Sequence, residues 1–256
     1  MYKMKSAEKF LLKGIDLDGK VVLEGGTSWG NTTDWIARKV KENGWKTELI
    51  SVDIDDDHFA EIEERLKGEF ESLKLWKGDL SHLDFIDDGS IDVIICNYTL
   101  SSVDQFPMRA LRALKEFHRV LKPGGHLLIT EEMPIWSVDV TSYPYWSKRL
   151  RIIKSISVLR SMSHFNEIHP TDLEETMKII GFKDLDWEEF VEKIDADRAT
   201  RFLDKRKQTL VQGSTDLHSE KINEGFTEMT EALVKEFEDT EEFSAPAYVL
   251  RGIKPE

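Results

Sequence analysis

Three acidic residues follow short apolar runs, at the positions where predicted β-strands end: Glu24, Asp53 and Asp79. If these strands are parallel, their carboxyl ends meet at one edge of the sheet, where open α/β sheets bind ligands. A carboxylate there can accept hydrogen bonds from both hydroxyls of a ribose, which suits Asp53 to an adenosine-containing ligand. Three acids at successive strand ends therefore predict a nucleoside-binding edge.

A turn rich in small residues, Glu24 to Gly30, separates the first predicted strand from the helix after it. Small residues let a ligand approach the backbone, and the amino end of a helix favours anionic groups. The turn lacks the Gly-x-Gly-x-x-Gly spacing that a dinucleotide pyrophosphate requires. A nicotinamide oxidoreductase is therefore a weaker alternative.

The elements that must position these residues alternate between strand and helix. The apolar patterns predict strands over residues 20–23, 49–52, 73–76, 91–96, 126–130, 183–191 and 247–253. Most of these strands are separated by helical patterns, such as the stripe from Pro107 to Leu121 that Pro123-Gly124-Gly125 ends. Strands joined through helices pair in parallel with right-handed crossovers. The expected fold class is α/β, a doubly wound and mostly parallel sheet with helices on both faces.

We expect a single domain over residues 1–256, with its core in 18–133 and 171–254 and helical insertions at 134–170 and 195–243. The segment 134–169 mixes aromatic residues with a basic stripe and is expected to cover an acceptor pocket, with simple packing as the alternative. Its basic helix over 148–160 could face an anionic substrate, a membrane surface, an acidic partner or the acidic remainder of its own chain. Thr171 and Glu174 predict a capping box for the helix that follows.

Composition narrows the class of protein. The formal net charge of −14 and a pI near 5.1 argue against nucleic-acid binding. No apolar run reaches membrane length, and the first residues do not resemble a secretory signal, so we expect a cytoplasmic protein without integral membrane association. Cys96 alone cannot form an internal disulfide or a thiolate zinc site, and no metal is expected. The oligomeric state stays open, with a homodimer among the alternatives.

Five motifs occur in the order seen in class I S-adenosylmethionine-dependent methyltransferases, which the first half of the chain closely resembles. They are Val21–Gly26, Ser51–Ile54, Gly78–Leu80, Ile91–Ile95 and Arg119–Gly125. The resemblance implies a seven-stranded sheet whose last strand, Tyr248–Ile253, is antiparallel and lies beside the fifth. It also implies S-adenosylmethionine as the cofactor and methyl transfer, which we expect to reach a small-molecule acceptor.

The resemblance also assigns site residues. The methionine part of the cofactor would lie against the turn, Glu24, Gly25, Gly26, Thr27, Ser28 and Gly30. The ribose would contact Asp53 and Ile54, and the adenine Asp79 and Leu80. Asn97 and Tyr98 would lie near the methyl group.

The sequence departs from the family pattern at two places. Ser28 replaces the central glycine of the turn and the bulky Trp29 follows it, which predicts a different course of the turn or a partly filled pocket. Leu100–Val103 stands where small-molecule members often carry a histidine pair, so no general base can be carried over. Cys96–Thr99 lacks the two prolines of amino-methylating DNA enzymes.

The catalytic residues are therefore open. The candidates are Asn97, Tyr98, His164 and His169, with Glu131 a further choice of base. The missing base also supports an alternative function, a protein that binds the cofactor through this fold and has no catalysis.

Overall fold

The computed structural model describes residues 8–106, 108–159, 164–195, 217–237, 240 and 242–256. The chain divides into two compact units. The first comprises Met1–Met133, Phe165–Phe190 and Ala247–Glu256, and the second comprises Pro134–His164 and Val191–Pro246. Parts of two predicted elements lie outside the described residues, namely the end of the basic helix at Arg160 and residues 196–216 of the second insertion. Pro107, the predicted start of a helix, also lies outside them.

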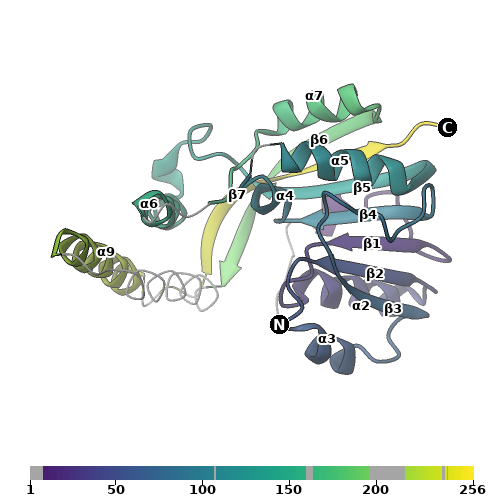
Figure 1. Ribbon diagram of the computed structural model, residues 1–256, viewed down its shortest axis with the longest axis horizontal. Coiled ribbons are helices and arrows are strands. Elements are labelled where there is room, and N and C mark those ends of the chain that lie inside the picture. The colour runs from purple at the N-terminus through teal and green to yellow at the C-terminus, as the bar shows by residue number, and fades with distance from the viewer. Residues whose placement is uncertain (1–7, 107, 160–163, 196–216, 238–239, 241) are drawn as a thin grey trace. The chain divides into compact units, whose positions relative to one another are not determined.

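The seven strands form one sheet in the order β3-β2-β1-β4-β5-β7-β6 (Figure 1). Their bounds are β1 Val21–Gly25, β2 Glu48–Asp53, β3 Ser72–Lys77, β4 Ile91–Asn97, β5 Leu121–Glu132, β6 Lys183–Asp195 and β7 Glu242–Ile253. The pairs among the first five strands are parallel, and β7 runs antiparallel to β5. The predicted mostly parallel, seven-stranded sheet and its antiparallel last strand are confirmed.

Helices cover both faces of the sheet in the first unit. These helices are α1 Glu8–Leu11, α2 Asn31–Asn43, α3 Phe59–Arg65, α4 Leu100–Val103, α5 Arg109–Val120 and α7 Pro170–Ile180. Trp35 and Ile36 of α2 share one buried cluster with Val22 and Val93 of the sheet. Phe117 of α5 lies on the opposite face, 3.5 Å from the place where a Cβ on Gly25 would stand. Side chains alternate between faces along a strand, so β1 contributes to both layers.

The junction between α5 and β5 differs from the sequence prediction. The helix ends at Val120 and the strand begins at once at Leu121, so the predicted helix stop at Pro123-Gly124-Gly125 lies inside the strand. Backbone hydrogen bonds to Lys254 hold the glycine pair in the strand: Gly124 N donates to Lys254 O at 2.8 Å, and Lys254 N donates to Gly125 O at 2.9 Å. Gly124 adopts a φ of 76°, which only glycine takes without strain.

The second unit contains η1 Val140–Ser142, α6 Pro144–Leu159 and α9 Leu217–Glu236, and the ends of β6 and β7 extend into it. Its aromatic residues pack on one another: the rings of Tyr145 and Phe243 stack with their centroids 3.6 Å apart. Lys148 of α6 pairs with Glu236 of α9 at 2.6 Å, so this cation of the predicted basic helix faces acid of its own chain. No helix in the described ranges is both long enough and apolar enough to cross a membrane.

Candidate cofactor-binding site

Glu24 is a fully buried acid one residue before the end of β1. Its Oε2 accepts hydrogen bonds from Ser51 Oγ at 2.6 Å and Thr33 Oγ1 at 2.8 Å. Its Oε1 is buried and has no hydrogen-bond partner in the described part of the chain. Burial raises the pKa of Glu24 to about 8, although the two hydroxyl donors act in the opposite direction. A buried oxygen without a partner costs about 1–3 kcal/mol, so this position favours a ligand that brings a donor.

The turn after Glu24 places three residues in the left-handed region of the backbone. Gly26 has a φ of 90° and Gly30 a φ of 81°, and Ser28 takes the same left-handed region at 46°. A Cβ on Gly26 would stand 2.0 Å from Thr99 Oγ1, so the turn packs directly against the segment after β4. Trp29 is 38% exposed and meets the His58 ring edge-on.

Asp53 ends β2 and joins the turn from the neighbouring strand. Its Oδ2 accepts from Ser28 N at 2.8 Å, and its Oδ1 accepts from Asp55 N at 3.0 Å. Each carboxylate oxygen can accept a second hydrogen bond, so both remain able to bind hydroxyls. Ile54 follows with 65% of its surface exposed, an apolar side chain beside that acid.

Asp79 stands two residues past the end of β3. Its Oδ1 accepts from Ser81 N and Ser81 Oγ, and its Oδ2 pairs with Arg109 Nη1 at 3.1 Å. Partial burial alone would raise the pKa of Asp79, but the bonds from Ser81 and the charge of Arg109 outweigh it, and the pKa lies below its usual value. Leu80 is buried and would contact a Cβ on Gly25 at 3.2 Å, which places it beneath the turn.

Asn97 ends β4, beside β1, and Tyr98 begins the segment after it. Asn97 is 6% exposed, and its Nδ2 lies 3.4 Å from Thr32 Oγ1 at the start of α2. Tyr98 has a φ of 51°, a costly conformation for an aromatic residue, and its N donates to Thr130 O at 2.7 Å. Gly25, the last residue of β1, pairs with Val52 in β2 and with Cys96 in β4. Glu24, Asp53 and Asn97 therefore lie at the carboxyl ends of three adjacent strands.

The candidate bases occupy different environments. His169 is the N-cap of α7 and its Nδ1 accepts from Thr171 N, so the predicted capping box at Thr171 is wrong by two residues. Pro170 explains the shift, because proline fits the first turn of a helix and its missing N–H needs no partner there. His164 belongs to the second unit.

Glu131 is 2% exposed on β5, and burial raises its pKa to about 7. Its Oε1 accepts from Ser101 N at 3.1 Å, at the start of α4. This contact ties the carboxyl group of Glu131 to the segment after β4.

Three polar residues around the acids were not singled out from the sequence: Ser51, Thr33 and Arg109. A serine inside an apolar strand, a threonine at a helix start and an arginine opening a helix are common features, so none of them predicts a functional role from sequence alone. Their role appears only when the strands align. Glu24 and Ser51 are register partners in β1 and β2, which brings a donor to that carboxylate.

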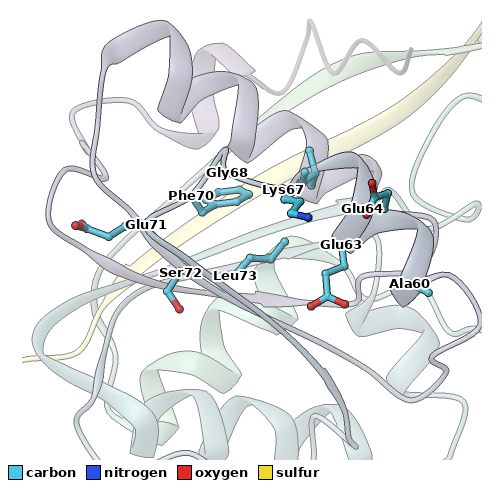
Figure 2. A pocket seen from close by; sticks show the side chains of 10 residues that line it. Ala60, Glu63, Glu64, Lys67, Gly68, Phe70, Glu71, Ser72 and Leu73 are labelled. Carbon is cyan, nitrogen blue, oxygen red and sulfur yellow. The ribbon is translucent and has the colours of Figure 1, made fainter.

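A hollow of about 410 Å³ lies away from this edge (Figure 2). It is lined by the end of α3 and the start of β3, including Lys67, Phe70 and Leu73. The start of β3 is the amino end of that strand, opposite to the edge that carries the three acids. It is therefore not part of the candidate site.

Comparison with known proteins agrees with the fold and the order of these residues. Residues 23–129 match the family model described as a methyltransferase domain. Residues 23–129 are therefore similar to a methyltransferase domain. The matched range spans β1 to β5 and contains each of Glu24, Asp53, Asp79 and Asn97.

Among curated relatives, a demethylmenaquinone methyltransferase of Staphylococcus epidermidis is 33% identical over 100 residues. That alignment covers 39% of this chain and 39% of the relative, so it spans well under half of either protein.

Two solved structures show the same fold over nearly the whole chain. A SAM-dependent methyltransferase of Methanosarcina mazei is 16% identical with a TM-score of 0.56, covering 94% of each chain. A phosphoethanolamine N-methyltransferase of Haemonchus contortus, solved with S-adenosyl-L-methionine, is 17% identical with a TM-score of 0.54, covering 97% of this chain and 51% of that one.

Proposed function

We propose that this protein transfers a methyl group from S-adenosylmethionine to a small-molecule acceptor. One observation carries the proposal: Glu24, Asp53 and Asp79 stand at the carboxyl ends of three adjacent strands, around a turn with left-handed residues. The methyltransferase-domain match over 23–129 supports it, as does the cofactor complex of the structural relative.

The residues present fit the cofactor. The ionised form of Glu24, which a nearby positive charge favours, would accept from the ammonium group of a methionine through Oε1. Gly25, Gly26, Thr27 and Gly30 would provide close backbone approach. Asp53 has acceptor capacity for the ribose hydroxyls, and Ile54 offers an apolar surface beside it. Asp79 and Leu80 would contact the adenine. Asn97 and Tyr98 would border the reacting methyl group.

When bound, the cofactor supplies a methyl group on a positively charged sulfur, already activated for transfer. The protein must then align the acceptor and keep water away. Buried Asn97 and the strained Tyr98 segment, held by Thr130 and Glu131 through backbone N–H groups, give a rigid wall for this task. The unfavourable φ of Tyr98 is maintained by these bonds, as expected for residues that function depends on.

The acceptor is proposed as a small molecule. The net charge of −14 disfavours nucleic acid, and the curated relative is named for a small-molecule substrate. The enclosed Glu131 and the helix-capping His169 favour an acceptor atom that needs no deprotonation by the protein, or one that is already ionised.

Two assays on the full chain test this proposal. Isothermal titration calorimetry with S-adenosylhomocysteine measures binding, and transfer of tritium from methyl-labelled S-adenosylmethionine to a metabolite panel measures turnover. We expect both to be positive. Binding without transfer to any compound, including simple amines, thiols and phenols, would favour the non-catalytic alternative. No binding would overturn both readings.

A further inference from the structure

Asp79 has one hydrogen-bond acceptor position left open. An ionised carboxylate offers about four acceptor positions. Ser81 occupies two of them at Oδ1, through its N at 2.9 Å and its Oγ at 2.8 Å. Arg109 Nη1 occupies one at Oδ2, at 3.1 Å. The remaining position belongs to Oδ2, and with 28% of the side chain exposed it is accessible to a ligand.

Arg109 is held on a second side by an aromatic ring. Its guanidinium carbon lies 4.9 Å from the centroid of the Phe106 ring, within cation–π range. Phe106 is 52% exposed, so the ring and the guanidinium form part of the surface next to Asp79. Met108 has a φ of 68° at the N-cap of α5 and turns the chain so that Arg109 begins the helix. The arginine is thus constrained by a helix start, a ring and a carboxylate.

We propose that Arg109 is a positioning residue for base recognition: it orients Asp79 so that the open position on Oδ2 accepts one N–H from the 6-amino group of the adenine. This inference rests on the proposed function. An exocyclic amine supplies the single donor that the open position requires. In a purine with a carbonyl at C6, the carbonyl oxygen would face Asp79 Oδ2, and both atoms are acceptors. Polar groups left unpaired in this way strongly disfavour binding of that purine relative to adenine.

The geometry also distinguishes positioning from direct contact. If Arg109 itself faced the base, its N–H groups would favour a C6 carbonyl, and its removal would increase the preference for adenine. If it acts through Asp79, removing it releases the carboxylate to rotate and decreases that preference. The sign of the change in base preference therefore separates the two roles.

The test compares two ligands that differ at the C6 substituent, S-adenosyl-L-homocysteine and S-inosyl-L-homocysteine, by isothermal titration calorimetry on the full-length protein. We expect the wild type to favour the adenosyl ligand by about tenfold or more, the scale of one hydrogen bond to a charged group. Arg109→Gln should reduce that ratio by about three- to fivefold, consistent with a partly exposed ion pair. The loss should fall on the adenosyl ligand.

Arg112→Gln is the matched control, because Arg112 lies on the same helix, is exposed, and loses the same charge. Its affinity ratio should equal that of the wild type, whereas Arg109→Lys should recover most of it. Phe106→Ala removes an exposed ring and should give a smaller decrease in the same direction, which keeps the test decisive if Arg109→Gln fails to fold.

An unchanged ratio in Arg109→Gln, an equal loss for both ligands, or a ratio that rises would overturn the inference. A wild type that binds neither ligand would instead overturn the proposed function.

Discussion

Ser28 N donates a hydrogen bond to Asp53 Oδ2 at 2.8 Å. This bond joins the turn after β1 to the end of β2, so two parts of the candidate site are fixed relative to each other before any ligand binds. It restrains one oxygen of the carboxylate that the resemblance assigns to ribose recognition. Because the donor is a backbone N–H, the bond survives the replacement of glycine by serine at position 28.

Replacing Asp53 by alanine should weaken binding of S-adenosylhomocysteine by about 1.5–3 kcal/mol, the usual range for lost hydrogen bonds to a charged group. Calorimetry measures the change, and circular dichroism checks that the variant is folded. Asp57→Ala is the control, since Asp57 is exposed in the same acidic run and should leave affinity unchanged. Equal affinities for Asp53→Ala and wild type would remove Asp53 from the site.

Replacing Ser28 by glycine should stabilise the protein by up to about 1 kcal/mol. The left-handed φ of 46° strains a residue with a Cβ by about 1–2 kcal/mol, and glycine removes this strain. Glycine also loses more conformational entropy on folding, which offsets about 0.5–1 kcal/mol of the gain. Chemical denaturation measures the difference. Ser28→Ala retains the Cβ and should not show the gain, and a Ser28→Gly protein less stable than Ser28→Ala would refute the strain.

Gly26→Ala should destabilise the protein more than Gly14→Ala. Both glycines have positive φ, 90° and 78°, but a Cβ on Gly26 would meet Thr99 Oγ1 at 2.0 Å whereas one on Gly14 would meet nothing within 4 Å. The backbone strain is similar, so the difference isolates the contact between the turn and the segment after β4. We expect a difference of about 1–3 kcal/mol, the scale for overpacking. Equal losses would mean that the two segments do not pack closely.

Stability should fall as pH rises because of Glu24. Its folded pKa of about 8 exceeds the usual glutamate value of 4.5, so the folded state holds the proton more tightly. The stabilisation is complete below the unfolded pKa and is lost as pH rises toward 8, with a slope of up to about 1.4 kcal/mol per pH unit. Glu131, with a folded pKa of about 7, contributes only over the lower part of this window.

Urea denaturation of Glu24→Gln between pH 7 and 8 checks this assignment. The variant should show a flatter pH dependence there than the wild type, while Glu131→Gln should flatten the curve mainly below pH 7. If Glu24→Gln keeps the full slope between pH 7 and 8, another group is responsible.

The sheet was predictable because strand and helix periods differ and several strands end at or beside a polar residue. Ile91 to Asn97 is nearly continuous in apolar residues and is buried throughout except for a half-buried Asp92, as expected for a strand covered on both faces. The junction at Leu121 was not predictable, because its Pro-Gly-Gly sequence is typical of a helix stop. Pairing with distant parts of the chain, Ile91 of β4 for Leu121 and Lys254 for the glycine pair, makes it a strand.

The candidate acids were predictable, but their partners were not. Which hydroxyl or guanidinium meets a carboxylate depends on register and on helix placement, so the pairing of Arg109 with Asp79 needed three dimensions. The extension of β6 to Asp195 and of β7 back to Glu242 was also missed. Residues 191–195 include three charged residues, and residues 242–246 include Ser244 and Pro246, and both features weaken the strand pattern. The role of 134–169 as a cover stays a prediction.

Hydrogen exchange of the intact protein, with and without saturating S-adenosylhomocysteine, tests the central claim most directly, because it locates the ligand along the chain. Ligand binding at the carboxyl ends of β1 to β4 should slow exchange in residues 24–30, 53–54, 79–80 and 97–98, and should leave the hollow between α3 and β3 unchanged. Saturation by the ligand without added protection in those four segments, or with protection confined to other parts of the chain, would contradict the proposed site.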